Sequence, residues 1–301
     1  MTIRNGVARV GDIDLVYEDR GELTAPPVLL IMGLGAQMLL WPEGFCERLV
    51  AQGYRVIRFD NRDIGLSSKM RVRSPKQNFF VSMLRFQFGL KNPAPYTLFD
   101  MAADAVGLLS VLGIDRAHIV GASMGGMIAQ IVAAKYPERV RSLGILFSSN
   151  NQPFLPPPHP NALIPLIKGP GANAPREVLL DHSVKVFRNI GSPAYRPTVE
   201  EIRTKANMLM DRSFHPAGVK RHFLAVMGTG NLRPLARNIH APTLVVHGKE
   251  DRLVPPSGGK AIAASIKGAR LELIDGMGHD IPEALVPQLA TLFSQNFRRA
   301  V

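Results

Sequence analysis

One pentapeptide constrains the fold of this chain more than any other segment: Gly-Ala-Ser-Met-Gly at residues 121–125. It matches Gly-x-Ser-x-Gly, and its surroundings agree with that pattern. An apolar run at 117–120 predicts a strand, and residues 127–136 predict a helix. A serine between strand and helix must turn sharply, and glycines on both sides remove side chains where the two elements come closest. We therefore predict that the Ser123 hydroxyl projects above a sheet, beside the positive end of a helix.

A serine hydroxyl at such a turn becomes a nucleophile only with a base, and the base needs an orienting acid. In strand–turn–helix sites of this kind, the acid follows the serine along the chain and the histidine comes last. Asp251 follows a predicted strand at 243–246, and His279 follows a predicted strand at 270–274. Since parallel strands end at one edge of a sheet, we expect Ser123, Asp251 and His279 to meet there.

Other residues compete for two of these roles. Glu250 directly precedes Asp251 and is the alternative acid. His247 also ends a strand, but it precedes the acid and is therefore out of order. The remaining histidines are expected to be ordinary surface or core residues: His118, His159, His182, His215, His222 and His240.

A serine nucleophile also needs two backbone N–H groups aimed at the tetrahedral oxygen, the oxyanion hole. Met124, the residue after the serine, is expected to supply one. The other should come from the loop after an earlier strand, predicted at 28–32, which runs into Gly33-Leu34-Gly35. Leu34 is the candidate because its flanking glycines free the backbone. An ordinary glycine turn is the alternative.

Together these segments resemble the α/β-hydrolase family from about Gly6 to Phe297. Within it, the chain is similar to bacterial esterases of the aclacinomycin methylesterase type, which carry a comparable Asp-Asn-Arg-Asp-x-Gly-x-Ser run at 60–67. One position departs from the pattern. Many members have His-Gly at the oxyanion loop, whereas this chain has Met32-Gly33, so whatever that histidine orders is missing.

The resemblance implies an α/β fold with a mostly parallel, doubly wound sheet and an antiparallel hairpin near the N-terminus. The alternation of strand and helix patterns agrees with it. We expect an α/β-hydrolase core at 1–149 and 236–301, and a helical cap at 150–235 inserted before the acid-bearing strand. Expected substrate contacts are Gly33, Met208, Phe214 and Phe223; the cap residues among them could instead pack the interior of the cap.

The resemblance further implies a serine hydrolase that cleaves a carboxylic ester through an acyl-enzyme intermediate. A C–C bond hydrolase or a cofactor-free peroxidase would use the same triad, and a non-enzymatic ligand receptor is an alternative of another class. Serine rather than aspartate at position 123 argues against dehalogenases and epoxide hydrolases of this fold. No cofactor is expected, and no Cys, His and carboxylate cluster has metal-ligand spacing.

The formal net charge of +12 favours anionic partners, although no nucleic-acid motif is present. Residues 69–91 interleave lysines and arginines with phenylalanines, and 78–90 predict an amphipathic helix. Such a stretch could contact a lipid or anionic interface, or act as a lid packed on the cap. The sequence shows neither a signal peptide nor a transmembrane run, so a cytoplasmic location is expected. The oligomeric state is open.

Overall fold

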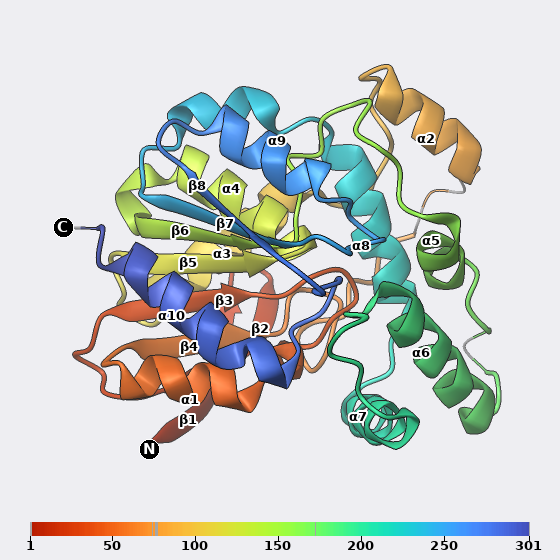
Figure 1. Ribbon diagram of the computed structural model, residues 1–301, viewed down its shortest axis with the longest axis horizontal. Coiled ribbons are helices and arrows are strands. Elements are labelled where there is room, and N and C mark those ends of the chain that lie inside the picture. Colours follow the sequence, from red (N-terminus) through yellow and green to blue (C-terminus); the bar gives the residue numbers. More distant parts are fainter. Residues whose placement is uncertain (1, 74, 76–77, 172, 301) are drawn as a thin grey trace.

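A central sheet organises the protein. The computed structural model describes residues 2–73, 75, 78–171 and 173–300 (Figure 1). Within them the sheet has eight strands in the order β1-β2-β4-β3-β5-β6-β7-β8. The strands are β1 (Ile3–Val10), β2 (Ile13–Arg20), β3 (Pro27–Ile31), β4 (Arg55–Phe59), β5 (Ala117–Ala122), β6 (Val140–Leu146), β7 (Thr243–Gly248) and β8 (Arg270–Ile274).

The pairing of these strands confirms the predicted fold class. β1 and β2 form an antiparallel hairpin, and β2 pairs antiparallel with β4. From β4 through β8 every pair is parallel. The carboxyl ends of β3 to β8 therefore lie at one edge of the sheet, where residues from distant parts of the sequence can meet.

Apolar side chains cover both faces of the sheet, because successive residues of a strand point to opposite sides. Leu29 and Ile119 join one core with helices α3 (Leu98–Val111), α4 (Met124–Lys135) and α9 (Ser257–Ser265). Val28 and Val120, one position away, join the other core with α1 (Glu43–Ala51) and α10 (Val286–Phe297). The central strands are thus buried on both sides, as a doubly wound parallel sheet requires.

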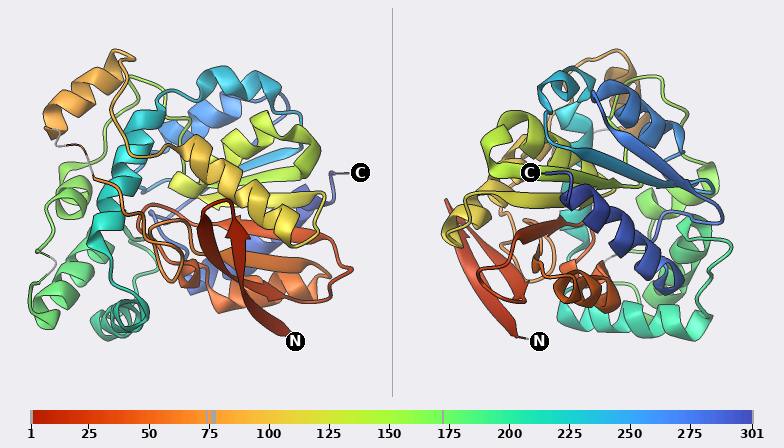
Figure 2. Two further views of the ribbon diagram at one scale, coloured as in Figure 1. Left: turned by 180° about the vertical axis from the view of Figure 1, so that it is seen from behind. Right: turned by 60° about the vertical axis from the view of Figure 1, so that its left-hand side comes forward.

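Four helices lie between β6 and β7 in sequence: α5 (Pro160–Ile167), α6 (Arg176–Ile190), α7 (Val199–Arg212) and α8 (Pro216–Thr229). They gather on the side toward which β5 and β7 point (Figures 1 and 2). All four fall inside the expected cap, residues 150–235, although that division itself stays a prediction. A short 3-10 helix, Arg233–Asn238, follows them and was not expected from the sequence.

A further helix, α2 (Phe79–Gln87), lies between β4 and α3 in sequence and stands at the outer edge of the molecule (Figure 1). It falls within the helix expected at 78–90. Among the described residues, no helix combines the length and apolar character that crossing a bilayer requires.

Candidate active site

Ser123 stands at a strained turn between β5 and α4. Its φ of 56° and ψ of −122° lie in a region that residues with a side chain rarely adopt. A Cβ added to Gly121 would lie 2.1 Å from the Gly125 carbonyl oxygen, and one added to Gly125 would lie 2.1 Å from the Ile31 oxygen. Glycine at both positions therefore lets strand, turn and helix approach closely enough to hold the serine in this conformation.

The structure brings the three residues singled out for catalysis into one hydrogen-bonded line. Asp251 follows β7 and His279 follows β8. The Nδ1 atom of His279 lies 2.7 Å from Oδ2 of Asp251, and its Nε2 atom lies 2.9 Å from Oγ of Ser123. A proton on Nδ1, donated to the carboxylate, leaves Nε2 free to accept the serine proton. The alternative acid, Glu250, does not take part in this line.

The electrostatics of Asp251 suit an orienting anion. Its Oδ1 atom accepts the N–H groups of Leu253 at 2.9 Å and Val254 at 2.8 Å. Burial alone would raise the pKa of Asp251, but the charge of His279 and hydrogen bonds from His247 and His279 lower this pKa to about 2. The carboxyl group is therefore ionised throughout the neutral range.

His247 contacts this aspartate, although the sequence indicated only an ordinary residue. It is fully buried at the end of β7, with Nε2 at 3.3 Å from Oδ2 of Asp251 and 2.8 Å from the Val254 oxygen. His247 thus lies beside the same carboxylate oxygen that His279 contacts. Its place four residues before Asp251 is the signal that could have pointed to this contact.

The loop that carries His279 is held by the end of α6 and the residues after it. The Ile190 carbonyl accepts the His279 N–H at 2.7 Å, and Ser192 Oγ accepts the Gly278 N–H at 2.8 Å. Ser192 in turn donates its N–H to Asp280 Oδ1 at 2.9 Å, and its hydroxyl donates to the same carboxylate. The histidine's backbone is therefore positioned from the segment between β6 and β7.

The expected oxyanion loop packs directly against the serine. A Cβ added to Gly33 would lie 3.0 Å from the Ser123 Cβ, so a larger residue there would require a small shift of the loop after β3 or of the serine. Leu34 follows in this loop. Met124 is the first residue of α4, and its N–H therefore has no partner within the helix. Both candidate donors thus belong to segments that adjoin Ser123.

His222 holds this loop, although the sequence predicted no special role for it. The imidazole projects from α8, accepts the Gly35 N–H on Nδ1 at 3.1 Å and donates from Nε2 to the Arg62 oxygen at 2.7 Å. Burial lowers the pKa of His222 to about 4, which keeps the ring neutral. No local pattern around position 222 in the sequence indicated this role.

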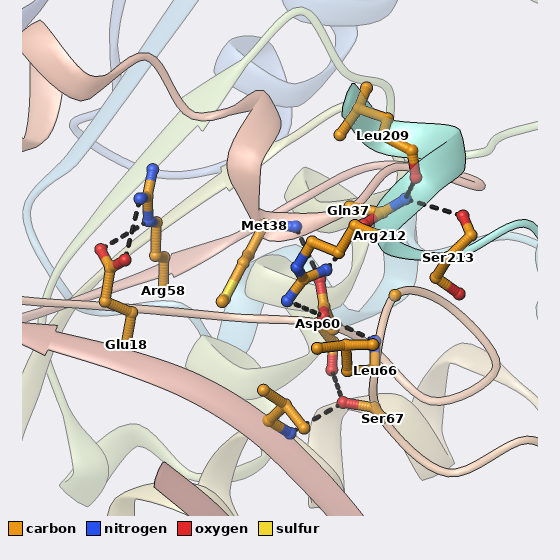
Figure 3. Close-up of polar contacts among 12 residues, drawn as sticks. Glu18, Gln37, Met38, Arg58, Asp60, Leu66, Ser67, Leu209, Arg212 and Ser213 are labelled. Atoms are coloured by element: carbon orange, nitrogen blue, oxygen red, sulfur yellow. Dashed lines mark hydrogen bonds and ion pairs between the residues drawn. The ribbon is translucent and has the colours of Figure 1, made fainter. Parts of the chain in front are cut away.

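Gln37 ties the same loop to the end of α7 (Figure 3). Its Nε2 atom donates to the carbonyl oxygens of Leu209 at 2.7 Å and Ser213 at 3.0 Å. Its Oε1 atom accepts from Arg212 Nη1 at 2.6 Å. One side chain thus fastens the loop after β3 to three residues that lie far away in sequence.

Asp60, at the end of β4, completes this network (Figure 3). The fully buried carboxylate accepts the N–H of Met38 at 2.8 Å and of Leu66 at 2.9 Å. Arg212 Nη2 lies 2.7 Å from its Oδ2 atom. A single carboxylate therefore links the loop after β3, the loop after β4 and the last residue of α7.

Asp63 makes a second link of the same kind. It receives two hydrogen bonds from the Arg221 guanidinium at 2.8 and 2.7 Å and one from the Tyr96 hydroxyl at 2.6 Å. Burial raises the pKa of Asp63, but the hydrogen bonds from Arg221 and Tyr96 outweigh it and lower the pKa overall. The two aspartates of residues 60–63 therefore bind one arginine of α7 and one of α8.

The expected substrate contacts differ in their surroundings. Gly33 adjoins Ser123, Phe223 is half-buried, and Met208 and Phe214 are 45% and 44% exposed. Their roles stay predictions. In the part of the chain that the structure describes, no group of three or more His, Cys, Asp or Glu side chains could hold a metal ion.

Comparisons with known proteins agree with the fold. The chain matches the family described as alpha/beta hydrolase fold over residues 26–283. The rhodomycin D methylesterase of Streptomyces peucetius is 28% identical over 309 residues, which cover 96% of each protein. A 2-hydroxy-6-oxononadienedioate/2-hydroxy-6-oxononatrienedioate hydrolase of Pseudomonas putida is 28% identical over 89% of this chain and 86% of that protein. A thermophilic esterase from Thermogutta terrifontis has a similar structure, with a TM-score of 0.73, 23% identity and coverage of 99% of each chain.

Proposed function

This chain belongs to the α/β-hydrolase family, and from that premise we propose that it hydrolyses a carboxylic ester with Ser123 as nucleophile. His279 is the general base and Asp251 the orienting acid. The observation that carries the proposal is the hydrogen-bonded line from Ser123 through His279 to Asp251, at 2.9 and 2.7 Å. The protein is therefore an enzyme, a carboxylic ester hydrolase.

Acylation begins when Ser123 Oγ attacks the carbonyl carbon and its proton passes to His279 Nε2. The carbonyl oxygen becomes an oxyanion, which the N–H groups of Leu34 and Met124 stabilise. The tetrahedral intermediate collapses when its carbon–oxygen bond to the alcohol breaks. His279 then gives its proton to the departing alcohol, and the acyl group remains on Ser123.

Deacylation repeats these steps with water. His279 takes a proton from water, the resulting hydroxide attacks the acyl carbon, and the proton returns to Ser123 as the acid leaves. Asp251 keeps the Nδ1 proton in place and stabilises the charged imidazolium in both halves. Its pKa of about 2 keeps it anionic while His279 gains and loses protons.

We propose that the natural substrate is a methyl ester, because the similar proteins of Streptomyces are named as rhodomycin D methylesterases. Cleavage of a C–C bond next to a carbonyl group is the second candidate, favoured by the similarity to the hydrolase of Pseudomonas putida. The same triad serves both reactions, so the substrate distinguishes them.

The decisive experiment measures turnover of nitrophenyl and methyl esters of increasing acyl length, with a 2-hydroxy-6-oxodienoate as the C–C substrate. Ser123→Ala should lose turnover roughly a millionfold while its fold is retained. Ser110→Ala, an exposed serine on α3, serves as the matched control and should keep full activity. Cleavage of the dienoate alone would favour the C–C reaction. Reaction with a serine-directed phosphonate without turnover of any substrate would point to a receptor.

We also propose a second partner, a lipid or anionic interface that residues 69–91 contact. The mixture of basic and aromatic side chains in this segment supports the proposal, and α2 lies at the outer edge of the molecule (Figure 1). Lys76, one of the basic residues of this segment, lies outside the described residues.

A further inference from the structure

Helix α2 is apolar on nearly all sides and yet is not buried. Of its nine residues, FFVSMLRFQ, only three are polar. Helices of such composition are normally enclosed in a protein core or a membrane. In α2, however, Phe80 and Phe88, the residue at its C-terminal end, are 79% and 68% exposed, whereas the small polar Ser82 is buried. The helix thus turns a polar residue toward the protein and phenylalanines toward solvent.

The exposed apolar side chains form one continuous face. Phe80, Leu84 and Phe88 follow each other at intervals of four residues and therefore align along one side of the helix. Phe154 lies beside the helix, because its N–H donates to Gln87 Oε1 at 2.7 Å, and this residue is 75% exposed. We call these four residues, together with the exposed Val81, the α2 face.

Basic residues flank the α2 face. The sequence contains no acidic residue between Asp63 and Asp100. Arg71 and Arg73 precede the helix and are exposed. Arg85, on the helix, folds toward its C-terminal end, where its Nη2 atom donates to the Lys91 oxygen at 2.7 Å. Positively charged residues therefore stand both before the apolar face in sequence and at its C-terminal end.

The α2 face lies near the segment between β6 and β7 rather than at the far end of the sheet. Helix α2 packs against α8, whose His222 holds the oxyanion loop. Figures 1 and 2 show α2 on the same side of the molecule as α5 to α8, beyond the carboxyl ends of the strands. A surface that bound this face would thus lie beside the helices that adjoin the candidate active site.

We propose that the α2 face docks on the surface of an anionic lipid bilayer. The phenylalanines and Leu84 would enter the boundary between headgroups and acyl chains, while the basic side chains meet anionic headgroups. Charge argues against a second copy of this chain as occupant, because two chains of net charge +12 with basic borders would repel each other. Docking would bring the enzyme close to esters dissolved in the membrane. This consequence rests on the proposed function, whereas the docking does not.

The test is co-sedimentation of the full chain with vesicles made of equal parts phosphatidylcholine and phosphatidylglycerol, compared with pure phosphatidylcholine. We expect binding to the anionic vesicles and weaker binding to the neutral ones. Phe80→Ser/Phe88→Ser should reduce binding at least about tenfold, since two apolar anchors are lost. The matched control is Val7→Ser/Leu23→Ser, which changes exposed apolar residues of the N-terminal region and should bind like the wild type.

Charge is tested separately. Arg71→Gln/Arg73→Gln should lower binding to anionic vesicles at low salt, by roughly fivefold for each arginine. Lys260→Gln/Lys267→Gln removes the same charge from exposed positions in and after α9 and should have a smaller effect. Equal losses in both variants would mean that net charge alone attracts the protein, and the proposal would be wrong.

Two further results would overturn the proposal. The first is absence of vesicle binding by the wild type; a dimer in analytical ultracentrifugation that Phe80→Ser/Phe88→Ser dissociates would then identify a second copy of the chain as the occupant. The second is unchanged vesicle binding in that variant with an altered chain-length preference for dissolved esters, which would make α2 a lid. Hydrolysis of nitrophenyl acetate is measured alongside, so that failure of docking and failure of the hydrolase assignment are seen independently.

Discussion

Replacement of His222 by glutamine tests whether a neutral, buried histidine holds the oxyanion loop. The ring is fully buried, and its two nitrogens bond the Gly35 N–H and the Arg62 oxygen. Burial lowers the pKa of His222 to about 4, from an ordinary value near 6.5. Between these values the unfolded chain binds a proton that the folded protein excludes, so stability falls as the pH drops through this window. This histidine alone should remove roughly 2–3 kcal/mol of stability between pH 7.5 and pH 4.5.

The assay is urea unfolding of wild type and His222→Gln at both pH values. Glutamine can accept from Gly35 and donate to Arg62 but does not titrate, so it removes the pH-dependent contribution. At pH 7.5 the variant should be less stable by about 1–3 kcal/mol, because the two hydrogen bonds fit less well. At pH 4.5 the difference should shrink by roughly 2–3 kcal/mol and can change sign. His118, whose pKa burial also lowers to about 4, contributes equally in both proteins and cancels.

Kinetics separates the role in the loop from the role in stability. Because the oxyanion hole acts on the transition state, His222→Gln should lower kcat about tenfold at pH 7.5 and leave KM nearly unchanged. A stability difference that stayed constant from pH 7.5 to pH 4.5 would refute the titration argument. An unchanged kcat would refute the claim that His222 positions the oxyanion loop.

Three other substitutions probe the remaining supports of the site. Asp251→Asn should keep the fold and lower turnover roughly ten-thousandfold, whereas Glu250→Gln should lower turnover far less. Steady-state kinetics of both variants compares the two acids. A larger loss of turnover in Glu250→Gln would show that Glu250 is the orienting acid. Ser192→Ala removes the hydroxyl that accepts the Gly278 N–H and should lower kcat about tenfold with little change in KM. A kcat equal to that of the wild type would mean that the loop with His279 keeps its position without Ser192. Arg212→Gln leaves the buried Asp60 without its cation and should lower the free energy of unfolding in urea by about 3 kcal/mol. Arg212→Gln/Asp60→Asn should restore most of that stability. A double variant no more stable than Arg212→Gln would contradict the pairing of Arg212 with Asp60.

The fold could be predicted because its signals are local. Apolar runs of four to six residues marked the central strands, and the glycines around Ser123 marked the turn into α4. The positions of Asp251 and His279 followed from topology, because each comes after a parallel strand. The 3-10 helix at Arg233–Asn238 carries no such periodic pattern, so nothing in the sequence indicated it.

The supports of the candidate site could not be predicted in the same way. Gly35 and His222 are 187 positions apart, and Gln37 and Arg212 are 175 positions apart. Which of them meet depends on how α7 and α8 pack over the loops, and no pattern within one segment encodes that.

The contacts of α6, α7 and α8 with two loops of the site limit which substitutions this protein can accept. Ser192 holds the His279 loop, and Arg212 and His222 hold the loop with Leu34. The inserted helices are therefore not an exchangeable module. A segment grafted from a relative would lose these contacts, unless its own side chains replaced them. Substitutions in these helices should thus be tolerated best away from Ser192, Arg212 and His222, the residues that contact the two loops.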